Sequence, residues 1–297
     1  MIKYIFRRFL ELLVALFLIA TATFFLTAAA PGDPLVSRTM SLPQASRDAM
    51  YAKYGLDKPL MQRYVITMKG MLHGDFGESV VYEGQTLQDI IREKLPVSAR
   101  LGLQSLIFGV LVGLLLGVIA AVKRDTWIDR TIVVFAVLLM SVPELVLGLV
   151  FQKYFAGTLK WFPVIGWPSG KELWFGGWKY TILPMLSGAL LHIATYSRLL
   201  KILDVLDQDY ILTARSKGLS EPKIVWSHIM RNSFIPIVTR LPVSMATCIT
   251  GSFIIEKIFS IPGIAAYYIE AVSANDLSIV LGETVFIAAL FIVVVFL

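Results

Sequence analysis

The sequence is poor in cysteine and histidine. It contains one cysteine, Cys248, and three histidines among 297 residues. A single cysteine can neither close an intrachain disulfide nor build a multi-cysteine metal site. Cys248 stands in an apolar run, which is typical of a small buried packing residue. The histidines, His73, His192 and His228, fall on different segments, and we expect His192, in an apolar run, to be a hydrogen-bonded interior residue and not a metal ligand.

Signature motifs of nucleotide-binding and hydrolytic enzymes are absent as well. No glycine-rich loop ends in Gly-Lys-Ser/Thr, so the sequence has no evident nucleotide site. His-Glu-x-x-His and Gly-x-Ser-x-Gly do not occur either, which argues against a membrane protease. Internal inverted repeats, common in secondary transporters, are not evident. The sequence therefore predicts a protein that is not an enzyme, with no cofactor or metal of its own.

Charged residues are scarce and apolar residues abundant. Hydrophobic residues make up 57% of the sequence and charged residues 16%, and the mean hydropathy is +0.73. These values lie outside the soluble globular range and predict an all-α polytopic membrane protein. The formal charge of +6 fits basic cytoplasmic loops in such a protein and is weak evidence for nucleic acid, so we expect the lipid bilayer and no nucleic acid as a partner.

Six apolar runs are long enough to cross a bilayer core, which takes about 20 helical residues. They cover residues 12–30, 101–122, 131–152, 180–197, 232–255 and 277–297. Lys3, Arg7 and Arg8 precede the first run, and Lys123 and Arg124 follow the second, so both sites are expected on the cytoplasmic side. The sequence thus predicts six transmembrane helices with a cytoplasmic N-terminus.

The first apolar run has a second interpretation. The basic start and Ala28-Ala29-Ala30 would also suit a secretory signal with a cleavage site. Signal peptides typically have shorter apolar cores, of about 7 to 15 residues, and several further runs follow here. An uncleaved first helix is therefore favoured.

The second run carries Gly109, Gly113 and Gly117 at four-residue spacing. This spacing puts three small residues on one face of a helix and predicts close approach of a neighbouring helix.

Three charged residues interrupt the apolar runs: Glu144 after Pro143, Arg240, and Glu283. Charges at membrane depth are costly and tend to face the bundle interior or a wet path, so all three are candidate pathway residues. Glu144 could instead be a buried hydrogen-bonded group beside a proline kink. Arg240 could reach the cytoplasmic interface with its long side chain.

Most of the polar sequence falls between residues 31 and 96. Ser41 and Gln44 form a plausible capping box for a helix that ends at Gly55. We expect three parts: an N-terminal transmembrane helix (1–30), an extracytoplasmic segment (31–96), and a five-helix transmembrane core (97–297) with a cytoplasmic loop at 204–231.

A polar island separates the fourth and fifth runs. Asp209 is a good N-cap, Lys217 suits the last turn and Gly218 suits the position after it, so a short helix is predicted over residues 210–217. Ser220 and Pro222 predict the start of a second helix. Because a two-turn helix is marginal alone in water, the first helix needs a surface to lie on. An ordinary solvated loop is the alternative.

At these residues the sequence resembles the membrane subunits of binding-protein-dependent ABC importers, and among them the B-type subunits of oligopeptide and dipeptide permeases. Members carry a cytoplasmic helix that docks on an ATPase. The matching residues are Gln208, Asp209, Tyr210, Thr213, Ala214, Arg215, Lys217, Gly218 and Leu219. Short motifs around Gly55, Gly74 and Ile261 extend the resemblance over residues 31–263. Leu212-Thr213-Ala214 replaces the Glu-Ala-Ala of the wider superfamily.

The resemblance implies a multi-pass subunit of a bacterial cytoplasmic membrane that forms half of a peptide translocation pathway. Its implied partners are a second homologous permease subunit, two ATPase subunits that carry ATP and Mg, an extracytoplasmic substrate-binding protein, and the peptide substrate. A cargo such as nickel, glutathione or another small solute is the alternative within this class. An ion-gradient transporter or channel, working through Glu144, Arg240 and Glu283, is the alternative outside it.

The sequence departs from the family pattern at two places. The segment 198–206 is two or three residues shorter than expected for the family. Because each residue turns a helix by about 100°, a deletion of two residues would rotate the docking helix far about its axis. Members also continue into a short cytoplasmic tail, so the resemblance implies further residues after Leu297.

Overall fold

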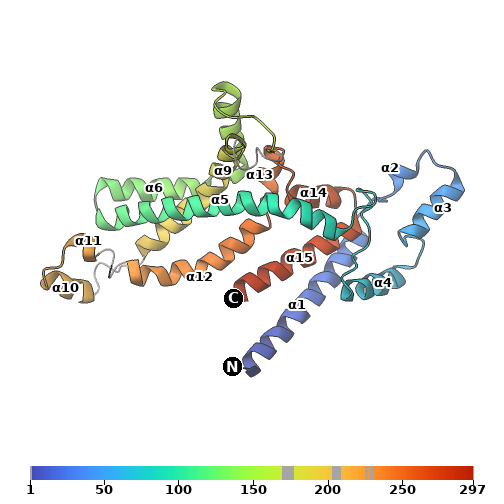
Figure 1. Cartoon of the computed structure of the whole chain (residues 1–297), viewed down its shortest axis with the longest axis horizontal. Coiled ribbons are helices and arrows are strands. Elements are labelled where there is room, and N and C mark those ends of the chain that lie inside the picture. Colours follow the sequence, from blue (N-terminus) through green and yellow to red (C-terminus); the bar gives the residue numbers. More distant parts are fainter. Residues whose placement is uncertain (1, 169–176, 203–208, 225–226, 228–229, 297) are drawn as a thin grey trace. The chain divides into compact units, whose positions relative to one another are not determined.

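The computed structural model describes residues 2–168, 177–202, 209–224, 227 and 230–296. Figure 1 shows that the described chain is helical. Its longer helices are α1 (Ile2–Ala29), α3 (Gln44–Lys53), α4 (Leu60–Leu72), α5 (Leu87–Val122), α6 (Trp127–Ser141), α7 (Glu144–Phe151), α9 (Trp178–Ile202), α10 (Asp209–Ser216), α12 (Met230–Ile249), α14 (Ile264–Ser273) and α15 (Leu277–Phe296). Shorter elements are α2 (Val36–Thr39), α11 (Glu221–Ile224), α13 (Phe253–Ile258) and the π-helix η1 (Gln152–Thr158). The described residues contribute one isolated β-bridge, Glu78 to Thr86.

The chain packs as two units. Unit 1 contains the residues up to Val97 together with Pro262–Phe296, and unit 2 contains Ser98–Ile261. The first boundary falls inside α5, and the second lies between α13 and α14. The predicted division at residues 30 and 96 concerns the side of the membrane and stays a prediction.

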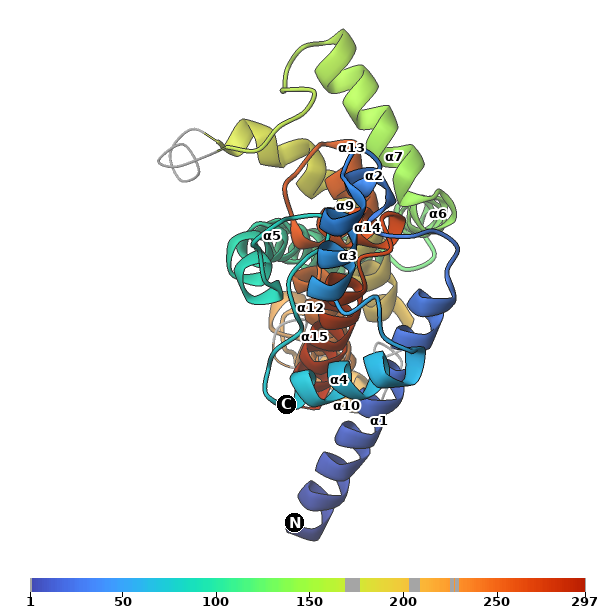
Figure 2. The same cartoon turned by 90° about the vertical axis from the view of Figure 1, so that its right-hand side faces the viewer.

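In unit 1, the first and last helices of the chain pack side by side. Ala20 and Phe24 of α1 are buried against Leu281 of α15. Three residues of α4, Tyr64, Met68 and Met71, close this cluster from one side, and Figure 2 shows α4 next to α1. The polar segment between α1 and α5 is therefore anchored, through α4, to the α1 and α15 pair.

Asp276 joins the polar segment of unit 1 to α15. The carboxylate caps α15 by accepting from the Ile279 N–H at 3.3 Å. Its second oxygen accepts from Ser79 Oγ at 2.6 Å, the Val80 N–H at 2.8 Å and the Val81 N–H at 3.1 Å. The side chain is fully buried, so these bonds replace its hydration.

The helix predicted after Ser41 is present, but the predicted capping box is wrong. α3 begins at Gln44 after Pro43, and no side chain caps its first turn. The proline, with its fixed φ, sets the helix entry instead. Gly55 follows the helix end with φ of +67°, as the predicted stop requires.

In unit 2, α9 lies at the centre and packs against α6 and α7. The predicted close approach of helices is confirmed at two of the three glycines of α5. A Cβ on Gly109 would come within 2.5 Å of His192 Cβ, and one on Gly113 within 2.8 Å of the Ile193 carbonyl oxygen. Ala189, Ala194 and Tyr196 of α9 are fully buried here.

The third apolar run is broken into two helices. α6 ends at Ser141, α7 begins at Glu144, and the two are bent by 99°. Pro143 causes the break, because residues before proline avoid the helical region, and Val142 adopts an extended conformation with ψ of 125°.

Among the described residues, four helical segments are long and apolar enough to cross a membrane, at 6–29, 87–122, 236–258 and 277–294. The count rises to five if the bent pair α6 and α7 forms one span. α9 is not one of these segments, although it has 25 residues. Its buried Thr181, Ser187 and Ser197 lower its hydropathy. The six-span topology stays a prediction.

Replacing Asp276 with alanine should destabilise the protein by about 3 kcal/mol, because buried donors on Ser79, Val80 and Val81 lose a charged acceptor. Asparagine keeps one acceptor oxygen and should cost less. The measurement is the apparent thermal unfolding midpoint of the purified full chain. Asp57→Ala, at an exposed carboxylate of the same unit, is the matched control. Equal midpoints for the two alanine variants would refute the role given to Asp276.

Candidate functional site

The polar island folds into two short helices, α10 and α11, which pack against each other. α10 begins at Asp209 and ends at Ser216, one residue earlier than predicted at each end, so Asp209 lies within the first turn. α11 begins at Glu221, directly after the predicted Ser220. The structure does not describe residues 203–208. Gln208 and part of the segment with the predicted deletion therefore lie outside the described residues.

α10 ends in a Schellman motif built on Gly218. Gly218 has φ of +72°, and its N–H donates to the Arg215 carbonyl at 2.9 Å. The Leu219 N–H reaches back to the Ala214 carbonyl at 3.3 Å. This 6→1 and 5→2 pattern satisfies two of the last carbonyls of the helix and fixes the direction of the chain after it.

The two faces of α10 differ. Ala214 is buried, whereas Thr213, Arg215, Lys217 and Gly218 are exposed and Leu219 is half-buried. Leu212 is 53% exposed, and it lies three residues before Arg215. Residues three apart share a helix face, so an apolar and a cationic side chain are presented together. Because arginine is enriched at protein contacts, this face of α10 is a candidate contact surface.

The second candidate site is a cavity of about 290 Å³ in unit 2, next to the bend between α6 and α7. Glu144, the first residue of α7, is half-buried at its wall, and Ser252 Oγ donates to Glu144 Oε2 at 3.4 Å. His192 Nε2 and Cys248 Sγ lie 3.2 Å apart on another part of the wall. The wall of the cavity therefore carries one carboxylate, one imidazole and several hydroxyl groups among largely apolar helices.

The expectation for His192 as a hydrogen-bonded interior residue is confirmed by its contact with Cys248. Cys248 is buried, as predicted. In the part of the chain that the structure describes, no three His, Cys, Asp or Glu side chains come together as a metal site.

The three pathway candidates occupy different places. Glu144 lines the cavity, Arg240 is exposed on α12 of unit 2, and Glu283 is fully buried in α15 of unit 1. Neither Arg240 nor Glu283 lines this cavity.

The sequence does not predict the roles of three residues that matter in the structure. Glu256, which the sequence places in a connector, is fully buried in α13 and accepts from Ser98 Oγ at 2.5 Å. Asp276 is the buried cap described above. Leu212 is the exposed aliphatic residue of α10, and its only signal is an apolar side chain within a polar stretch.

Comparison with known proteins adds two kinds of similarity. The family model described as binding-protein-dependent transport system inner membrane component matches residues 113–297, and the N-terminal model of the same transport systems matches residues 1–102. The dipeptide transport system permease protein DppB of Lactococcus lactis is 38% identical over 295 residues, covering 99% of this chain and 94% of the relative.

Two further relatives show the same extent of similarity. DppB of Bacillus subtilis is 35% identical, covering 100% of this chain and 94% of its own length. The oligopeptide transport system permease protein OppB of Salmonella typhimurium is 35% identical, covering 98% of this chain and 93% of its own length. The similarity thus extends over both units.

Replacing Gly218 with valine should loosen the end of α10, because an L residue in the left-handed region costs about 1–2 kcal/mol. A Cβ there meets no atom within 4 Å, so the effect is conformational and not steric. We expect the Leu219 amide to exchange its hydrogen roughly 5 to 30 times faster, the equivalent of that free energy. Gly218→Asn is the control, since asparagine tolerates this region. Equal exchange rates in both variants would contradict the motif.

Proposed function

Because the chain belongs to the family of binding-protein-dependent transport system inner membrane components, we propose that it is a membrane-spanning permease subunit of an ATP-driven importer of dipeptides or oligopeptides. The observation that carries this proposal is similarity over nearly the whole chain to relatives named as peptide permeases, at 34–38% identity. Such a subunit is a transport component and not an enzyme.

The proposed topology has six spans and places the N-terminus in the cytoplasm of a bacterial cell, with the protein in the cytoplasmic membrane. The four apolar segments and the bent pair supply five spans. α9 supplies the sixth, since 25 helical residues extend about 37 Å, more than a bilayer core. Its polar side chains are buried among other helices of unit 2, where they need not meet lipid.

The proposed partners are a second permease subunit, two ATPase subunits and an extracytoplasmic peptide-binding protein. The absence of a Gly-Lys-Ser/Thr loop from this sequence supports assigning ATP and Mg to the ATPases. Residues 31–96 would face the binding protein, because they follow the first span and precede the second.

α10 is the proposed coupling element. Its eight residues form a rod of about 12 Å with Leu212, Thr213 and Arg215 exposed, suited to a groove on an ATPase subunit. The Schellman motif at Gly218 holds the rod at a fixed angle to the following chain, so movement of the ATPase pair is transmitted to the spans and not absorbed by a flexible turn. The remaining coupling residues, Gln208, Asp209, Tyr210, Ala214, Lys217 and Leu219, would complete this contact or its support.

The cavity at the bend is the proposed part of the translocation pathway. A carboxylate is costly within a span unless it faces a polar interior, and Glu144 stands at such a place beside Ser252. Arg240 and Glu283 remain pathway candidates on charge alone.

Leu212→Ser and Arg215→Ala should each weaken ATPase docking at least about tenfold, since burial of a leucine side chain is worth about 1.5–3 kcal/mol and arginine is enriched among the residues that carry binding energy. The measurements are copurification of the ATPase subunits and uptake of a labelled tripeptide into proteoliposomes containing the whole complex. Arg124→Ala, in the basic loop after α5, is the matched control.

The same assay separates the alternatives. Uptake should require ATP inside the proteoliposomes and should be insensitive to ionophores. Unlabelled peptide should compete with the labelled tripeptide, whereas nickel and glutathione should not. Uptake that continues without the ATPase subunits, or that both α10 variants leave unchanged, would exclude the proposed coupling.

Glu144→Ala should lower uptake roughly tenfold while the ATPase subunits still copurify, because a charged contact in the path is worth about 1.5–3 kcal/mol. Ser252→Ala should have a smaller effect, as its bond to Glu144 is long at 3.4 Å. Glu11→Ala removes an exposed carboxylate of α1 and is the control. Unchanged uptake in Glu144→Ala would remove Glu144 from the pathway.

A further inference from the structure

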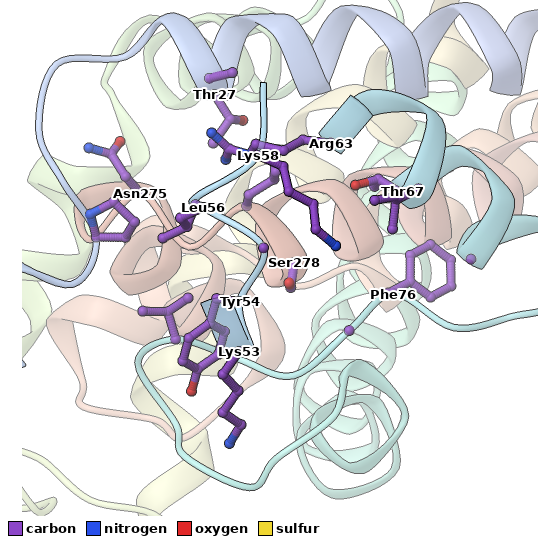
Figure 3. A pocket seen from close by; sticks show the side chains of 18 of the residues that line it. Thr27, Lys53, Tyr54, Leu56, Lys58, Arg63, Thr67, Phe76, Asn275 and Ser278 are labelled. Carbon is purple, nitrogen blue, oxygen red and sulfur yellow. The ribbon is translucent and has the colours of Figure 1, made fainter. Parts of the chain in front are cut away.

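A basic cavity of about 370 Å³ lies in unit 1, where α1 ends. Its wall comes from the end of α1, the end of α3, one face of α4, the turn before Gly77, and the start of α15. Figure 3 shows Lys53, Lys58 and Arg63 around it, together with the hydroxyl residues Thr27, Thr67 and Ser278. Asp75 is the one carboxylate among the described residues that line it.

The charges of this cavity are not balanced within the described chain. Lys53 forms an ion pair with Glu78 at 2.9 Å, and Asp75 Oδ1 accepts from the Gly77 N–H at 2.9 Å. Lys58 and Arg63 form no ion pair with any described carboxylate. Arg63 is half-buried, and burial lowers the pKa of its guanidinium. A partly desolvated cation without a counter-charge favours an anionic ligand.

The position of α4 along α1 indicates that the anionic ligand comes from the membrane. Tyr64 of α4 bonds to Thr21 Oγ1 at 2.9 Å, and its ring stacks on Phe25 at 5.2 Å. Both partners lie inside the apolar segment of α1, which runs to Ala29. At about 1.5 Å per residue, α4 therefore touches α1 roughly 6–12 Å below the end of that segment. An interfacial helix buries its apolar face about 5–10 Å into the boundary between headgroups and acyl chains, which overlaps this depth.

The outer face of α4 suits that depth. Met61 is 63% exposed and Leu72 is 85% exposed, and Leu60 and Val65 are also exposed. A short helix with one packed face, basic residues and exposed aliphatic side chains is typical of a helix lying in the membrane interface. Leu18 and Leu26 of α1 are exposed as well.

We propose that this cavity binds the headgroup of an anionic phospholipid, with Lys58 and Arg63 holding the phosphate and the acyl chains lying on the exposed face of α1. Thr27, at the cavity wall, directly follows Leu26 on the lipid side, so headgroup and chain contacts are adjacent in the sequence. A soluble phosphate would use the same cations but none of the aliphatic surface. The site would tie the outer segment of the protein to the membrane surface.

The test is retention of lipid by the purified full chain in native mass spectrometry. The probes are dioleoyl-phosphatidylglycerol, dioleoyl-phosphatidylcholine and inorganic phosphate. We expect phosphatidylglycerol to be retained in preference to phosphatidylcholine. The Lys58→Gln, Arg63→Gln double variant should lose at least about tenfold in retention, the equivalent of one charged hydrogen bond. Lys69→Gln is the matched control, because Lys69 is exposed on the same helix and does not line the cavity.

Three results would overturn the proposal: equal retention by the double variant and the unsubstituted chain, equal loss in Lys69→Gln, or displacement of phosphatidylglycerol by millimolar inorganic phosphate. A fourth would be loss of binding-protein capture in the double variant with lipid retention unchanged, which would assign the cations to a protein partner. Lys58→Gln alone, at an exposed position, keeps the test valid if Arg63→Gln fails to fold. It should show an intermediate loss of phosphatidylglycerol.

Discussion

A bilayer core offers no hydrogen-bond partners to a polypeptide backbone, and this constraint governs the whole chain. It accounts for the long helices, and it explains why backbone N–H groups at helix breaks and helix starts have hydrogen-bond acceptors. At the break after α6, the Val142 N–H still bonds to the Leu138 carbonyl, and the Val146 N–H bonds to the Pro143 carbonyl. At the start of α15, Asp276 supplies the acceptor that the first turn lacks. At these two places the irregular backbone is paired with a specific donor or acceptor.

The same constraint determines which side chains are buried and which are exposed to lipid. Polar side chains of α9 are buried among helices, and aliphatic side chains of α1 and α4 are exposed. Polar groups inside a span, such as Glu144, are then available for the proposed pathway, while the proposed docking surface for an ATPase lies on α10. The proposed pathway and the proposed docking surface therefore fall on residues of different polarity and burial.

Local signals in the sequence were sufficient for several elements. The end of α10 follows from Gly218, because few other residues tolerate its φ, and the break near residue 142 follows from Pro143. The contact at Gly109 and Gly113 follows from helical spacing. The Ser41 cap failed because Pro43 competes for the same turn. Asp276 and Glu256 fall between two apolar runs, and their partners at Ser79 and Ser98 lie far away in the sequence, so no local pattern reveals such a pair.

The bond between Asp276 and Ser79 has a consequence for biosynthesis. The two residues are 197 positions apart, and α1 likewise finds its main neighbour only in α15. At roughly 5–20 residues per second, a ribosome needs about 10–40 s to make the intervening chain. During that interval the first span and the segment after it have been delivered to the membrane without their permanent partners. Unit 1 therefore acquires its permanent contacts only once α15 has been synthesised.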